Sequence, residues 1–114
     1  MIVALVADLM FESRIDAVAR QVEADVRTVR GVEQVRAALD DTSGVLLDMS
    51  VAPEDTLALI GELKAARGGL PIIAFLSHVQ VELTGQTREA GADEVLSRSA
   101  FVARLPQILS ELSR

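Results

Sequence analysis

The sequence alternates short apolar runs with longer amphipathic stretches along its whole length, and this alternation constrains the fold more than any other feature. The apolar runs at residues 2–7, 45–47 and 72–76 are unbroken, which is typical of strands buried on both faces of a sheet. Shorter segments at 25–29 and 93–97 complete a set of five predicted strands. Strands and helices in strict alternation predict a parallel sheet with right-handed crossovers and helices on both faces.

An amphipathic stretch follows each predicted strand. In the first stretch, apolar residues recur from Phe11 at steps of four, three and four, with charged residues on the opposite face. The third is predicted to begin at Pro53, because proline suits a first helical position. The fourth, at 79–90, is predicted to end at Gly91 in a left-handed conformation.

The last stretch contains a proline, Pro106, that conflicts with a continuous helix. Proline breaks a helix interior but is tolerated in the first turn. We therefore expect the regular part of this helix to begin near Pro106, after an irregular turn from Ala100.

Composition and charge limit the classes of function. The 114 residues are expected to form a single domain, 1–114, and half of them are hydrophobic. The net charge of −6 argues against nucleic acid or an anionic membrane as a partner. The absence of cysteine excludes disulfides and thiolate metal sites, and no apolar run reaches the ~20 residues of a membrane span. We expect a cytoplasmic protein.

Polar residues follow the apolar runs at the points where the predicted strands end. Asp8 follows the first strand, Asp48 the third, Ser77 and His78 the fourth, and Arg98 the fifth. Open parallel sheets bind ligands in the crevice beyond the carboxyl ends of their strands. The sequence therefore predicts a functional site at this edge, centred on Asp48.

The order and spacing of several residues resemble the receiver domain of bacterial response regulators. Asp8 lies where that family has an acidic pair, and Asp48 lies where it has its phosphate-accepting aspartate. Residues 70–73 (LPII) and 90–93 (AGAD) resemble the family's entries to strands four and five, and Arg98 falls at the family's lysine position. The resemblance implies a flavodoxin-like three-layer sandwich with a five-stranded parallel sheet in the order 2-1-3-4-5.

Other positions depart from the family pattern. Ala7 replaces the first acid of the pair, Leu76 replaces the switch hydroxyl, Val95 the switch aromatic residue and Ser99 the proline after the lysine. These departures indicate a degenerate receiver, or pseudo-receiver.

The resemblance also implies a weak metal site. The family holds Mg²⁺ with the acidic pair, the acceptor aspartate and a backbone carbonyl two residues later, which here would be Asp8, Asp48 and Ser50. Because Ala7 removes one acid, we expect either no cofactor or weakly bound Mg²⁺. We expect no catalytic residue, and the protein is not expected to be an enzyme.

Arg98 has two interpretations. Its guanidinium group could hold the Asp48 carboxylate through two hydrogen bonds in the resting protein, in place of a metal and a phosphoryl group. The alternative is an exposed arginine at a strand end, where an ion pair stabilises the fold by only about 0–1 kcal/mol.

Ser77 and His78 are the remaining candidates for contacts to an anion. Ser77 is more simply explained as the cap of the helix predicted to start near Val79. His78, the single histidine, could hydrogen-bond Asp48 or Asp8, or respond to pH, and a local hydrogen bond in its loop is favoured.

Three functions are compatible with these observations. The first is a receiver-like signalling module that acts by binding a protein, such as a histidine kinase or an output protein, with homodimerisation through residues 77–114. The second is an active receiver phosphorylated on Asp48 with Mg²⁺. The third is a flavodoxin-like domain that binds a small ligand, although no glycine-rich phosphate loop follows the first strand.

Overall fold

A computed structural model describes residues 1–77 and 80–113. Five strands form one parallel sheet in the order β2-β1-β3-β4-β5, as predicted. The strands are β1 (Ile2–Leu5), β2 (Val26–Val29), β3 (Gly44–Asp48), β4 (Ile72–Leu76) and β5 (Glu94–Ser97). The helices are α1 (Leu9–Gln21), α2 (Val32–Ala37), α3 (Pro53–Ala66), α4 (Val81–Ala90) and α5 (Arg98–Leu112), with a short 3-10 helix, η1 (Leu39–Asp41).

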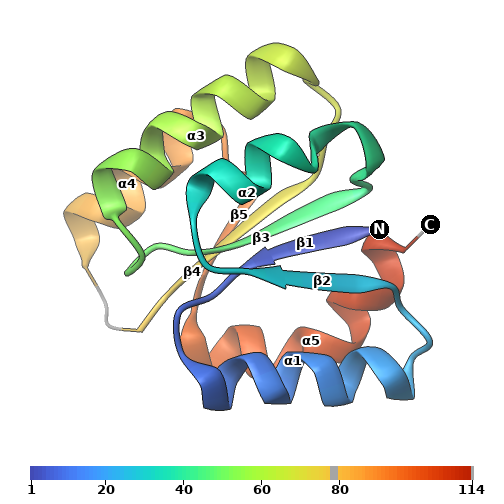
Figure 1. Cartoon of the computed structure of the whole chain (residues 1–114). Helices are drawn as coiled ribbons and strands as arrows, with labels where there is room; N and C mark the ends of the chain where they lie inside the picture. Colours follow the sequence, from blue (N-terminus) through green and yellow to red (C-terminus); the bar gives the residue numbers. More distant parts are fainter. Residues whose placement is uncertain (78–79, 114) are drawn as a thin grey trace.

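The helices cover both faces of the sheet. Figure 1 shows α2, α3 and α4 on one face and α1 and α5 on the other. Successive side chains of a strand point to opposite faces of the sheet, so each strand contributes to both layers. For example, Val45 and Leu47 face the α2–α3 side, and Leu46 faces the α1–α5 side.

The central strands are buried as their unbroken apolar character predicts. Every residue of β1, and Val45, Leu46 and Leu47 of β3, has no exposed surface. By contrast, β2 lies at the edge of the sheet and is only partly buried. Burial on both faces fixes β1 and β3 side by side, so that their carboxyl ends open at the same edge.

Gly91 ends α4 with a positive φ of 122°, as predicted for a glycine at this position. A Cβ atom there would lie 2.9 Å from Cγ of Lys64, so the close approach to α3 also favours glycine.

The prediction for the last helix is wrong. The helix α5 is regular from Arg98 and contains Pro106 in its interior. Ser97 caps its first turn by accepting a hydrogen bond from the Ala100 amide. A continuous stripe of buried residues, among them Phe101 and Leu105, packs on the sheet through both halves of the helix. This packing offsets the hydrogen bond that proline cannot donate.

The predicted start of the fourth helix needs a correction as well. The helix α4 begins at Val81 with Gln80 as its N-cap, so Ser77 is not the capping residue. His78 and Val79 lie outside the described residues. In the part of the chain that is described, no helix is long and apolar enough to cross a membrane.

Candidate functional site at the carboxyl ends of the strands

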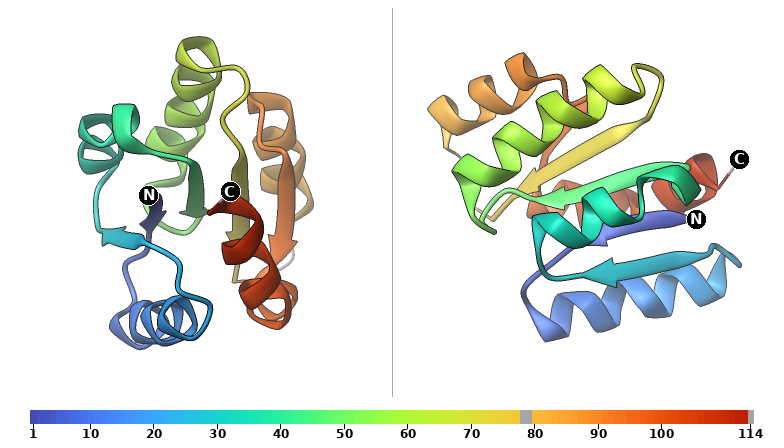
Figure 2. Two further views of the ribbon diagram at one scale, coloured as in Figure 1. Left: turned by 90° about the vertical axis from the view of Figure 1, so that its right-hand side faces the viewer. Right: turned by 45° about the horizontal axis from the view of Figure 1, so that its top comes forward.

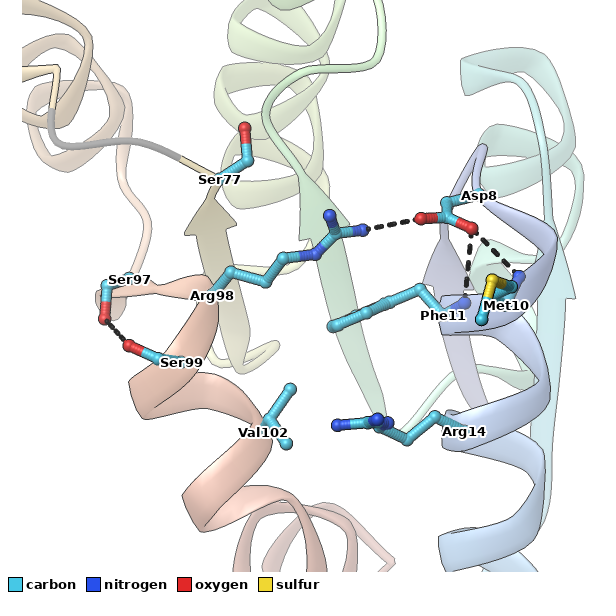
Figure 3. A pocket seen from close by; sticks show the side chains of 9 residues that line it. All are labelled: Asp8, Met10, Phe11, Arg14, Ser77, Ser97, Arg98, Ser99 and Val102. Atoms are coloured by element: carbon cyan, nitrogen blue, oxygen red, sulfur yellow. Dashed lines mark hydrogen bonds and ion pairs between the residues drawn. The ribbon is translucent and has the colours of Figure 1, made fainter.

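The topology brings Asp8, Asp48, Ser77 and Arg98 to one edge of the sheet. Asp48 is the last residue of β3, and the other three lie just beyond the ends of β1, β4 and β5. Figure 3 shows Asp8, Ser77 and Arg98 around the gap between the first turns of α1 and α5. The predicted location of the site therefore agrees with the structure, whereas the predicted contacts within it need revision.

Asp48 is a buried carboxylate held by its own loop. Only 4% of the residue is exposed. Its Oδ1 atom accepts hydrogen bonds from the Ser50 amide at 3.0 Å and from the Ser50 hydroxyl at 2.6 Å. A buried carboxylate is costly unless it is hydrogen-bonded, and Ser50 meets part of this requirement locally.

Asp8 has a different role because its two oxygen atoms serve two elements. Oδ1 accepts hydrogen bonds from the amides of Met10 and Phe11, which caps the N-terminus of α1. Oδ2 accepts a hydrogen bond from Arg98 at 3.3 Å. Asp8 thereby connects the start of α1 to the start of α5.

Arg98 does not pair with Asp48, so the predicted ion pair between them is wrong. The guanidinium group extends across the face of Phe11, with Cζ 4.3 Å from the ring centroid, and reaches Asp8 instead (Figure 3). The Phe11 ring attracts the cation toward α1 and so favours Asp8 as its partner.

The carboxylates predicted to hold Mg²⁺ have other partners in this arrangement. Both oxygens of Asp8 are engaged, one by the α1 amides and one by Arg98. One oxygen of Asp48 is engaged by Ser50. Across the described residues, no group of three acidic, histidine or cysteine side chains is placed to hold a metal ion. Mg²⁺ bound at Asp8 and Asp48 would therefore have to replace some of these hydrogen bonds.

Beside these residues lies a pocket of about 760 Å³ between α1 and α5. It is lined by Asp8, Met10, Phe11, Arg14, Ser77, Ser97, Arg98, Ser99 and Val102 (Figure 3). Asp48 is not among the lining residues, so this pocket is separate from the predicted acceptor.

Sequence reasoning missed the contributions of Phe11, Arg14 and Val102 to this pocket. Phe11 had been assigned only to the buried face of its helix, and it does stack with the core residues Phe75 and Phe101. A signal was present, since Phe11 and Arg14 are three residues apart in the first turns after Asp8 and so lie on one side of the helix. Pairing this side with α5 required the tertiary structure.

Solved structures with the same fold were identified, whereas no family model and no curated protein matches the sequence. A response regulator from Thermotoga maritima superposes with a TM-score of 0.81 at 12% identity, over 97% of this chain and 94% of the other. A CheY-like receiver domain protein from Methanospirillum hungatei gives 0.79 at 14% identity, over 97% and 94%.

A third structure, NtrX from Brucella abortus, gives a TM-score of 0.80 at 20% identity over 97% of this chain. The present chain spans only 25% of that protein's length. Identities in this range establish the fold alone. With its strand order and the three-layer arrangement of its helices, the chain has the flavodoxin-like fold of CheY-like response regulator receiver domains.

Proposed function

We propose that this chain is a receiver-like signalling module that acts through a protein partner, with an impaired phospho-acceptor site at Asp48. The observation that carries the proposal is the state of Asp48: the residue is 4% exposed and its Oδ1 atom accepts two hydrogen bonds from Ser50. An acceptor must present an oxygen in line with the incoming phosphorus, and the burial of Asp48 opposes this approach.

The neighbouring positions support the same proposal. Phosphoryl transfer depends on neutralising charge at the equatorial oxygens of the transferred group. Arg98, a cation at this edge, is directed toward Asp8 and not toward Asp48. Leu76 is an apolar side chain packed in the core and offers no hydroxyl, and Ala7 offers no carboxylate. The chain thus lacks three of the contacts that would assist transfer.

The proposed partner is a protein, either a histidine kinase or an output protein, and nucleic acid is disfavoured by the net charge of −6. The proposed contact surface is the last third of the chain, residues 77–114. It includes the edge strand β5, whose residues are partly exposed, and Val81 at the start of α4, which is 81% exposed. We place the protein in the cytoplasm and propose no enzymatic activity for it.

Acetyl phosphate with Mg²⁺, followed by intact-mass measurement, tests the state of Asp48. We expect no stoichiometric phosphoryl adduct on the wild-type chain under conditions that fully modify an active receiver domain run in parallel. A stoichiometric adduct that disappears in Asp48→Asn would establish the alternative, an active phospho-receiver. The Asp48→Asn variant is the matched control because it preserves the shape of the side chain and the acceptor atom for Ser50 while removing the nucleophilic carboxylate.

A further inference from the structure

The pocket between α1 and α5 carries an excess of positive charge on an acidic protein. Two arginines, Arg14 and Arg98, and a single acid, Asp8, line it. Asp8 is neutralised within the fold, because one oxygen caps α1 and the other accepts from Arg98. The whole chain has a net charge of −6, so the positive charge of this pocket is opposite in sign to that of the protein as a whole.

The donors of Arg98 are largely unused. Among the described residues it makes one hydrogen bond, at 3.3 Å, although a guanidinium group has five N–H donors. Its Nε atom is buried and has no hydrogen-bond partner in that part of the chain. A buried donor without a partner is unfavourable, and an oxyanion that draws the guanidinium group into a new hydrogen-bonding geometry would relieve it.

Arg14 provides the second cation. It is exposed on α1, and none of the ion pairs between described residues involves it. In Figure 3 the side chains of Arg14 and Phe11 extend from α1 toward α5, and Val102 extends toward them from the opposite helix. The guanidinium group of Arg14 therefore points into the gap between α1 and α5. The side chain of Arg98 spans the same gap closer to the ends of the strands.

The rest of the lining suits an apolar body. Met10, Phe11 and Val102 contribute apolar surface, and Met10 is 83% exposed, which is unusual for a large hydrophobic side chain. The volume of about 760 Å³ falls within the range of about 300–1,000 Å³ that small-molecule sites occupy. A mostly apolar pocket with a few convergent polar groups is the usual form of such a site.

We propose that this pocket binds a small aromatic carboxylate, with its negative charge attracted by the two arginines that line the pocket, Arg14 and Arg98, and its ring in the apolar lining between α1 and α5. Planar guanidinium groups match a carboxylate with paired hydrogen bonds, which a neutral ligand of the same shape cannot form. Asp48 does not line this pocket, although its neighbours Asp8, Ser77 and Arg98 do. Such a ligand would link α1 to α5 and thereby give the module a small-molecule input.

Amide NMR titration of the labelled full chain with naphthoate tests the proposal. Naphthylmethanol, which has the same ring system without the charge, and inorganic phosphate, which has charge without a ring, are the matched ligands. We expect saturable naphthoate shifts centred on the pocket residues, with a Kd of about 1 mM or tighter. Both matched ligands should bind about tenfold or more weakly, because each lacks one of the two recognised features.

Arg14→Gln and Arg20→Gln separate the pocket from general charge. Both arginines are exposed on α1 and both variants lose one positive charge, but only Arg14 lines the pocket. Arg14→Gln should weaken naphthoate binding about tenfold, whereas Arg20→Gln should retain it within about twofold. Asp48→Asn should also retain it, so that failure of this proposal is distinguishable from failure of the proposed function.

Several outcomes would overturn the site. The first two are the absence of saturable shifts at about 10 mM naphthoate and shifts centred on α4 or β2. The others are equal affinity for naphthoate and naphthylmethanol, and equal weakening of naphthoate binding by Arg14→Gln and Arg20→Gln. Arg14→Gln is expected to fold, because it is exposed and glutamine is a good helix former.

Discussion

At the scale of single residues, two carboxylates at the same edge of the sheet have different local partners. Asp48 is buried and bonded to Ser50, and Asp8 is partly exposed and shared between a helix terminus and Arg98. An arginine nearby could have paired with either acid. It pairs with the one whose neighbour, Phe11, offers an aromatic face to the guanidinium group.

The hydrogen bond from the Ser50 hydroxyl to Asp48 should stabilise the fold. In Ser50→Ala, the buried carboxylate loses a charge-assisted hydrogen bond, and we expect the free energy of unfolding to fall by about 1–3 kcal/mol in denaturant titrations. Ser13→Ala, on the exposed face of α1, is the control and should change stability by no more than about 0.5 kcal/mol. Equal stabilities of the two variants would show that Asp48 does not depend on Ser50.

The two functions of Asp8 can be separated by substitution. Asp8→Ala removes both the cap and the ion pair, and it should cost about 1–2 kcal/mol in thermal or chemical unfolding. Asp8→Ser keeps a capping oxygen and removes only the ion pair. Because that pair is partly exposed, we expect Asp8→Ser to cost less than about 1 kcal/mol. If serine were as destabilising as alanine, the ion pair with Arg98 would be the more important of the two interactions.

At the scale of the elements, α5 shows packing prevailing over propensity. Pro106 stands in the helix interior on the exposed side, while Phe101, Leu105, Ile108 and Leu109 form the buried stripe. The helix tolerates the proline because the residues on either side of it are held against β1, β3 and β4. Local sequence rules alone favour an interruption at this position.

Replacing the proline should therefore increase stability. Pro106→Ala restores an N–H donor to the helix interior, where proline costs about 3 kcal/mol or more. The more flexible unfolded chain offsets about 0.4–1 kcal/mol of this gain. We expect a net increase of about 2 kcal/mol or more in the free energy of unfolding, measured by urea titration. A decrease would mean that the ring of Pro106 makes a favourable contact that outweighs the missing hydrogen bond.

At the scale of the whole molecule, each layer of helices exposes large apolar side chains at one place. Large exposed apolar side chains occur at the starts of two helices on opposite layers: Leu9 and Met10 on α1, and Val81 on α4. Figure 2 shows α4 and α1 at opposite sides of the sheet. A partner that binds the α4 part of residues 77–114 would cover Val81, whereas Leu9 lies on the opposite layer.

Val81→Asp and Leu9→Asp form a matched pair for testing this surface. Each replaces the first residue of a helix, where an acid is tolerated because of the helix dipole. If the chain self-associates through residues 77–114, sedimentation velocity at increasing concentration should show weaker association for Val81→Asp and unchanged association for Leu9→Asp. The reverse pattern would move the interface to the α1 layer.

The sequence by itself determined the sheet, its parallel order and the edge at which the polar residues meet. Unbroken apolar runs such as 45–47 must be buried on both faces, and local signals at Pro53 and Gly91 set the ends of helices. These features depend on neighbours in the chain, which a sequence displays directly.

Only the tertiary structure decided which side chains pair within the site and which helix lies opposite which. The partner of Arg98 depends on Asp8, ninety residues earlier in the chain, and on the Phe11 ring that its guanidinium group contacts. The pocket exists because α1 and α5 pack on the same face of the sheet and bring Arg14 opposite Val102. The same long-range packing holds Pro106 inside a helix, because burial along α5 outweighs a local preference that the sequence expresses clearly.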